Sequence, residues 1–141
     1  MENKLFAAAF VLIMLLGIAV AALPALAGPI LIKYASSVGD TPCINRVMGG
    51  YSLGLYNSAQ HTITITGVKV DGEPKEFCIP HTDPSPVQMP SMTKRAINIE
   101  LGQGDPCEVS GQVISYLATF TYSTPDRKGL TQDEKVSFVC P

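Results

Sequence analysis

The chain has 141 residues, a formal net charge of −2 and four cysteines. Its 10 Lys and Arg are outnumbered by 12 Asp and Glu and form no basic stripe, which argues against nucleic-acid binding. It contains no phosphate-binding loop, dinucleotide fingerprint or Gly-x-Ser-x-Gly motif. We therefore predict a protein that is not an enzyme and has no small-molecule substrate and no cofactor.

The first feature along the chain is an uncharged stretch of 28 residues, Leu5 to Ile32. Residues 5–23 alone make 19 residues, close to the roughly 20 that an α-helix needs to cross a bilayer. We predict an apolar α-helix over residues 1–33, held in a membrane or packed against other helices. Two small residues four apart, as in this stretch, let helices approach closely. The candidate helix-packing residues are Ala9, Ile13, Leu16, Gly17, Val20 and Ala21.

The same stretch also has the features of a secretory signal peptide. Small residues precede Gly28, so a signal peptidase could cut between Ala27 and Gly28. If the cut falls after Ala27, the new N-terminal residues 28–34 could be donated as a strand to a neighbouring copy.

Residues 34–141 form the second predicted domain. Apolar and polar residues alternate there, and no segment has a helical period, which predicts an all-β antiparallel sandwich of the immunoglobulin-like or pilin-like kind. The alternation is clearest over 51–55, 63–65, 97–101, 114–122 and 136–138.

The strand that begins at Ile63 predicts a local irregularity. Its alternation changes phase at Gly67, which is how a β-bulge appears in a sequence. The pair Asp71-Gly72 follows and is a strong signal for a tight turn. We expect residues 75–79 to return as the partner strand.

Two later segments are predicted to be loops. Residues 80–90 hold four prolines and predict an extended surface loop without a strand, and residues 123–133 predict a polar hairpin tip. Of the two histidines, His61 lies in a predicted turn and His81 lies in the proline-rich loop. Asp83 could join His81 as a metal ligand, but two such residues in one loop are common by chance, so we predict no metal site.

The four cysteines all follow the apolar stretch. Their separations of 35, 29 and 33 residues exclude the CxxC spacing of zinc and redox sites. An even number of cysteines after an export-type segment predicts two disulfides in an oxidising compartment outside the cytosol. The sequence leaves all three pairings open. The disulfide candidates are Cys43, Cys78, Cys107 and Cys140.

Taken together, these segments resemble an archaeal type IV pilin or a related pilin-like surface protein. Residues 51–57 (YSLGLYN) and 63–72 (ITITGVKVDG) are similar to the first hairpin of such domains. Gly111-Gln112 and residues 120–122 are similar to their long later strand. The resemblance implies a homopolymeric filament on the cell surface, with helices in its core and β-domains outside, that serves adhesion or attachment. It also implies that the membrane holds the subunit before assembly. It further implies that a short leader is cut between Lys4 and Leu5, which keeps the helix.

Two other interpretations of the sequence stay open. One is a secreted fibre subunit, cut after Ala27, that donates its N-terminal strand. The other is a single-helix membrane-anchored binding domain or a virion membrane protein.

Overall fold

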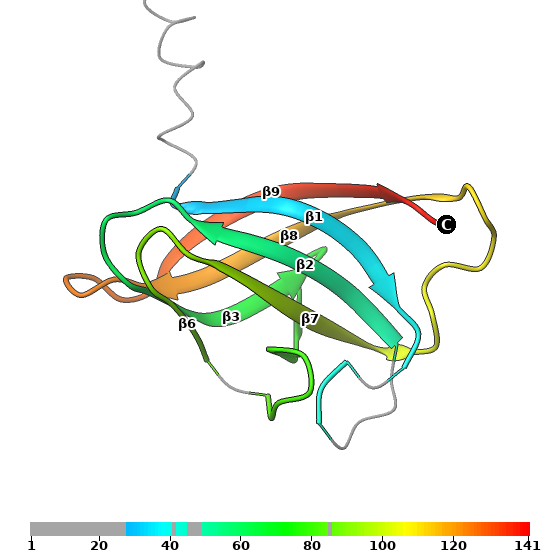
Figure 1. The fold of residues 1–141 in the computed structure, drawn as a ribbon, viewed down its shortest axis with the longest axis horizontal. Helices are drawn as coiled ribbons and strands as arrows, with labels where there is room; N and C mark the ends of the chain where they lie inside the picture. The colour runs from blue at the N-terminus through cyan, green and yellow to red at the C-terminus, as the bar shows by residue number, and fades with distance from the viewer. Residues whose placement is uncertain (1–27, 41, 45–48, 85) are drawn as a thin grey trace, which may run out of the picture.

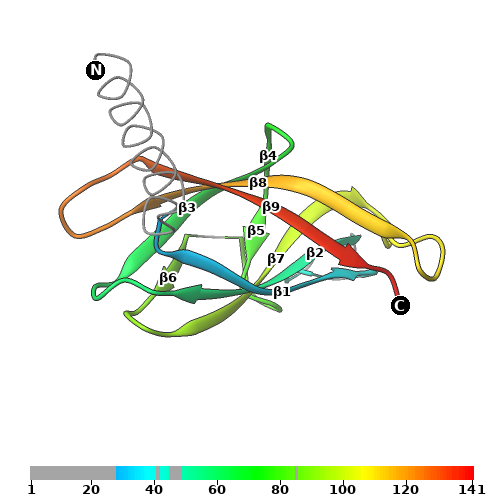
Figure 2. The ribbon, with the colours of Figure 1, turned by 90° about the horizontal axis from the view of Figure 1, so that it is seen from above.

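The computed structural model describes residues 28–40, 42–44, 49–84 and 86–141. These residues form two antiparallel sheets that lie over one another (Figures 1 and 2), which confirms the predicted all-β antiparallel fold. The first sheet has the order β1-β2-β7-β5, with β1 at Ile30–Val38, β2 at Gly49–Asn57, β7 at Lys94–Gln103 and β5 at Phe77–Cys78. The second has the order β4-β3-β8-β9, with β4 at Glu73–Lys75, β3 at Ile63–Val70, β8 at Val113–Ser123 and β9 at Leu130–Val139. The short strand β6 (Val87–Met89) also pairs with β3.

Strand β1 takes the place of the last part of the predicted helix over 1–33, whose end is therefore wrong. Pro29 precedes the strand and cannot donate a helical hydrogen bond. The β-branched side chain of Ile30 is fully buried, and that of Ile32 packs against the same core. Pairing with β2 therefore prevails over the general apolar character of this segment. The rest of the predicted helix, residues 1–27, lies outside the described residues.

The hairpin after Ile63 agrees with most of its prediction. The register between β3 and β8 shifts between Ile65 and Gly67, which confirms the β-bulge. Asp71 and Gly72 both have positive φ, 49° and 83°, and form the tight turn into β4. The return strand differs from the prediction, because only β4 pairs with β3. The chain then crosses to the other sheet, where β5 pairs with β7.

The two predicted loops are shorter than expected. Residues 87–89 of the proline-rich segment form β6, because apolar Val87 and Met89 are buried against the core while Gln88 between them is exposed. The polar tip between β8 and β9 is confined to residues 124–129, since both flanking strands continue towards it in register.

The core lies between the sheets and is built from alternate residues of the long strands. In β8 the inward residues Tyr116, Ala118, Phe120 and Tyr122 are buried, whereas the positions between them are exposed or half-buried. This alternation is the pattern expected of strands with one buried face. The most deeply buried large side chains include Leu53, Leu55, Ile63, Ile65, Ile97, Ile99 and Phe120.

Candidate functional site

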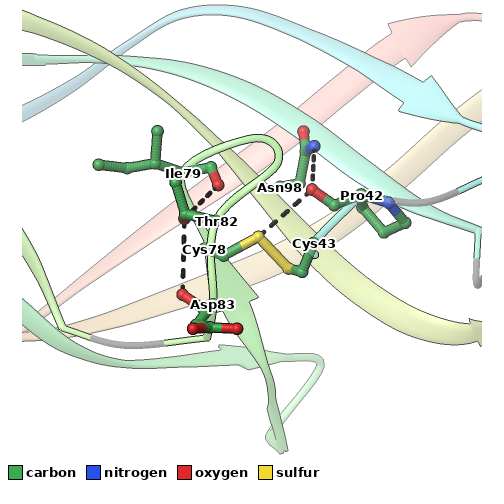
Figure 3. The surroundings of a disulfide bond; sticks show 7 residues. All are labelled: Pro42, Cys43, Cys78, Ile79, Thr82, Asp83 and Asn98. Atoms are coloured by element: carbon green, nitrogen blue, oxygen red, sulfur yellow. Dashed lines mark hydrogen bonds between the residues drawn. A yellow bond between two sulfur atoms is a disulfide. The ribbon is translucent and has the colours of Figure 1, made fainter. Parts of the chain in front are cut away.

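The first disulfide joins Cys43 to Cys78, with Cα atoms 5.9 Å apart. It fastens the segment after β1 to β5 on the outer side of the first sheet (Figure 3). Asn98 of β7 supports the same segment, since its Nδ2 donates a hydrogen bond of 2.8 Å to the carbonyl of Pro42. Both cysteines are buried, so the bridge is part of the folded framework.

The second disulfide joins Cys107 to Cys140 and links the segment before β8 to the end of β9. Ser37, near the end of β1, donates a hydrogen bond of 3.2 Å from its hydroxyl to Cys107 Sγ. This bridge therefore lies where the far ends of β1 and β9 come together. Two disulfides in the folded chain point to an oxidising, extracellular environment.

The near ends of β1 and β9 are joined by the side chain of Gln132. Its Oε1 accepts a hydrogen bond of 3.1 Å from the N–H of Ile30, and its Nε2 donates one of 2.6 Å to the carbonyl of Ile30. The same Nε2 lies 2.6 Å from Glu134 Oε1. The amide of Gln132 thus acts as a peptide group of a neighbouring strand would. We call this contact the glutamine clip.

Gly28 lies directly against the glutamine clip. Its φ is +113°, a value that side chains with a Cβ rarely adopt. A Cβ at this position would lie within van der Waals overlap of Gln132 Oε1. A glycine is therefore required at the point where the apolar stretch enters the β-domain. This is the one residue of the predicted cleavage positions that the structure describes; Lys4, Leu5 and Ala27 lie outside it.

Between its two ends the seam of β1 and β9 opens into a groove of about 550 Å³. Both strands are at the edge of their sheet, so their outward backbone groups have no partner strand among the described residues. Residues 30–35 line one side of this groove and residues 134–137 line the other. Each edge carries protection against strand addition, because β1 has a register shift near Lys33 and β9 presents Lys135.

An aromatic cluster packs beneath this seam. The rings of Tyr51 and Tyr116 are stacked with centroids 4.0 Å apart, and Phe138 of β9 meets Tyr51 edge-on at 6.0 Å. Burial raises the pKa of Tyr116 well above its ordinary value, and the neighbouring Tyr51 adds to this. Burial, followed by the charge of Asp71, also raises the pKa of Tyr51. Both phenols stay neutral at physiological pH, and the cluster joins the sheets by apolar contact.

The structure describes only some of the other predicted site residues. The helix-packing candidates Ala9, Ile13, Leu16, Gly17, Val20 and Ala21 all lie outside the described residues. His61 is in the turn between β2 and β3, and His81 is in the loop after β5. Among residues 28–40, 42–44, 49–84 and 86–141, no group of three or more His, Cys, Asp or Glu side chains is suited to hold a metal. The same part of the chain contains no helix of the length and hydropathy needed to cross a membrane.

No family model matches the chain, and no curated protein matches it. Several expectations therefore stay predictions. They are the resemblance to pilins, the homopolymeric assembly and the membrane stage before assembly. The expected absence of an enzymatic activity, of nucleic-acid binding, of a cofactor and of a small-molecule substrate also stays a prediction.

Sequence reasoning missed the glutamine clip and the buried Asn57. Gln132 could have been found as the polar residue at an inward position of β9, between Leu130 and Val136. Asn57 ends β2 and is fully buried; its Nδ2 donates to the carbonyls of His61 and Met89. A polar residue at the end of an alternating run was its signal.

Proposed function

We propose that this chain is the structural subunit of an extracellular pilus-like filament, with its apolar N-terminal segments packed in the core and its β-domains outside. One observation carries the proposal: the uncharged stretch continues directly into an edge strand that is fastened at both ends. Gln132 holds the start of β1, and Ser37 meets the disulfide-bonded Cys107 near its end.

This arrangement suits a subunit that is tethered through its N-terminal segment. A pull on Gly28 along β1 loads the β1–β2 ladder in shear, so several backbone hydrogen bonds resist it together. The glutamine clip shares part of that load with the second sheet. The two disulfides keep the rest of the domain from extending.

The deciding experiment is the mature N-terminus of the native protein, measured by intact mass, together with electron microscopy of the native material. We expect a start at Met1 or Leu5 and filaments that dissociate in detergent, because helices in the core are held by apolar packing. Monomers that stay in the membrane fraction would contradict the proposal in favour of an anchored binding domain or a virion membrane protein.

A second candidate, a secreted fibre subunit that donates β1 to its neighbour, is favoured by the strand that residues 30–38 form. Exchanged between copies, this strand could make the same pairs with another copy's β2, while Cys43–Cys78 keeps the connecting segment fixed to its own domain. A mature N-terminus at Gly28, fibres that resist detergent, and monomers after deletion of residues 28–34 would establish this candidate and exclude the first.

A further inference from the structure

Large apolar side chains stay exposed on the outer face of the first sheet, beside the start of β1. Leu31, Tyr34 and Met92 are 40%, 53% and 59% exposed. Leu31 lies opposite Tyr56 in the β1–β2 ladder, and the hydroxyl of Tyr56 donates to Met92 Sδ at 3.5 Å. We call these four residues the tyrosine patch. Exposed apolar side chains that gather in this way commonly mark a contact surface.

The tyrosine patch lies at the end of the domain where the N-terminal segment enters it. The N–H of Ser58 donates a hydrogen bond of 2.9 Å to the carbonyl of Pro29, and the N–H of Met92 donates one of 2.9 Å to the carbonyl of Asn57. These bonds hold the end of β2 and the segment before β7 beside the start of β1. The C-terminus lies at the opposite end of the domain (Figures 1 and 2).

The covalent chain limits the distance between the tyrosine patch and the uncharged stretch. An uncharged stretch of this length has to be covered by lipid until other copies cover it. Leu31 follows Ala27 by only four residues, which span at most about 14 Å when fully extended. A stretch held in lipid up to residue 27 therefore keeps the patch beside the membrane surface. This tether gives the membrane an effective concentration that no partner in solution has.

Cations accompany the tyrosine patch. Lys33 Nζ lies 5.3 Å from the centroid of the Tyr56 ring, and Lys94 lies opposite Tyr56 in the β2–β7 ladder. A hollow of about 180 Å³ beside Tyr34 is lined by Lys33, Lys94 and Arg95 together with small or apolar residues. No acidic residue is among those that line this hollow. The patch is therefore apolar and positively charged.

Acidic side chains near the patch do not cancel this charge. The adjoining groove between β1 and β9 adds one acid, Glu134, and one cation, Lys135. The Oε1 of Glu134 already accepts the hydrogen bond of 2.6 Å from Gln132 Nε2. This whole end of the domain has five Lys or Arg and a single Asp or Glu, counted over residues 28–34, 56–62, 90–95 and 124–130. An anionic surface is the partner that such an end attracts.

The residue types of the patch suit the boundary between lipid and water. Tyrosine has an apolar ring and a polar hydroxyl, and it is enriched at the level of the lipid headgroups. Lysine can lay its apolar stem along an apolar surface while its ammonium group stays in water. Lysines beside an anionic membrane are also attracted by its negative surface potential.

We propose that the tyrosine patch binds the β-domain to an anionic membrane surface before assembly, with Leu31 and Met92 against the lipid and Lys33 and Lys94 facing headgroup phosphates. This inference rests on the proposed filament function and adds an orientation of the β-domain at the stage before the N-terminal segments pack together. A lipid surface is favoured over a second copy as the occupant, because the tether brings the patch to it and its charge complements the lysines.

Tryptophan fluorescence of the full-length chain in vesicles tests the proposal. The chain contains no tryptophan, so one introduced by Met92→Trp reports only its own surroundings. The vesicles contain anionic lipid, and a share of the lipid is brominated near the headgroup end of its acyl chains. We expect blue-shifted emission that the brominated lipid quenches. Val109→Trp is the matched control and should emit as in water without quenching, because Val109 is 65% exposed in the turn beside Cys140 at the opposite end.

A charge reversal supplies the second measurement. Lys33→Glu/Lys94→Glu should lower the ratio of quenched to unquenched tryptophan at position 92 by about ten-fold or more, because carboxylates are repelled by anionic headgroups. Zwitterionic vesicles should lower the same ratio without any charge reversal. Lys69→Glu/Lys75→Glu makes the same change of net charge on the β3–β4 hairpin and should leave the ratio unchanged.

The outcomes separate membrane binding from mere attachment through the N-terminal segment. Equal quenching at positions 92 and 109 would overturn the proposal. Quenching at position 92 that is insensitive to both lipid charge and Lys33→Glu/Lys94→Glu would also overturn it, since the tether alone would then explain the proximity. Emission at position 92 that is blue-shifted but not quenched would overturn it in favour of a second copy as the occupant.

Electron microscopy of the native protein tests the filament function separately. Filaments from a chain whose tryptophan at position 92 never meets lipid would overturn the membrane binding and leave the filament standing. Charge-dependent quenching in a protein that forms no filaments would support the membrane binding and contradict the filament. The absence of both would overturn both proposals.

Discussion

The two edge strands that border the seam are held in different ways. Strand β9 pairs with β8 in one unbroken register and ends beside the disulfide of Cys140. Strand β1 pairs with β2 through a register shift, and its bonds to β9 and Cys107 come from the side chains of Gln132 and Ser37. The strand that carries the N-terminal segment is thus the one fastened without a covalent bond of its own. This difference would let β1 bear load or exchange while β9 stays in place.

The disulfides offer the largest test of that comparison. Replacing Cys107 and Cys140 by alanine should lower the free energy of unfolding by about 2–4 kcal/mol, because a closed loop of 33 residues is released in the unfolded chain. It should also raise amide exchange in both β9 and the end of β1, since Ser37 loses its sulfur acceptor. Denaturant unfolding and hydrogen exchange of the full-length chain in detergent measure the two effects.

The matched control is the double replacement of Cys43 and Cys78, which opens a loop of 35 residues and should cost a similar amount. Its exchange effects should be confined to β5 and the segment after β1. If both replacements raise amide exchange in β9 equally, the second disulfide does not hold the ends of β1 and β9 together more than the first does.

The glutamine clip is expected to have the next largest effect. Gln132→Leu should destabilise the fold by about 1–3 kcal/mol, because it leaves the N–H and carbonyl of Ile30 without partners in a buried place. The amide of Ile30 should exchange much faster, while β8 amides keep their protection. Gln88→Leu, at an exposed position of β6, is the control and should leave exchange at Ile30 unchanged.

Much of the fold could be predicted from local patterns. The alternation in residues 114–122 depends on one buried face, and the phase change at Gly67 depends on one extra residue. Both features can therefore be recognised from a local pattern of residues. The crossing of the chain from β4 to β5 could not be predicted, because the choice of sheet for Phe77 and Cys78 is made by packing against β7.

The candidate site was harder to predict than the fold. The even number of cysteines indicated two disulfides, but their pairing follows from which strand ends meet in space. The apolar character of residues 30–33 predicts a continued helix, since Ile and Leu suit both structures, and only pairing with β2 makes them a strand. Gln132 contacts a residue 102 positions away, so no local pattern contains its partner.

A smaller effect is expected where β1 lies on β2. Gly54→Ala should destabilise the domain by about 1 kcal/mol, at the low end of the cost of overpacking, because the half-exposed Tyr34 ring can move aside. The double variant with Tyr34→Ala should recover most of this loss. Gly67→Ala is the control, since its Cβ would meet Thr121 at an ordinary 3.4 Å. Urea unfolding measures both losses of stability. Equal losses for the Gly54 and Gly67 variants would contradict the close packing of Tyr34 on Gly54.

The smallest effect at neutral pH is expected for Tyr116→Phe, which tests the aromatic cluster beneath the seam. The Tyr116 hydroxyl is buried and has no hydrogen-bond partner among the described residues, so its removal should change stability little near neutral pH. Above pH about 10, the ordinary pKa of tyrosine, the wild-type unfolded chain loses this proton first. The folded chain keeps it, because burial raises the pKa of Tyr116.

The contribution of this tyrosine to stability is therefore complete below pH about 10 and is lost as the pH rises further, since the unfolded state then binds fewer protons than the folded one. The unfolding midpoint should therefore fall less between about pH 8 and about pH 11 for Tyr116→Phe than for the wild type. The unfolding midpoint of Tyr34→Phe, which alters an exposed ring of β1, should fall as much as that of the wild type. Equal alkaline losses in all three proteins would show that the stack of Tyr51 and Tyr116 opens before it titrates.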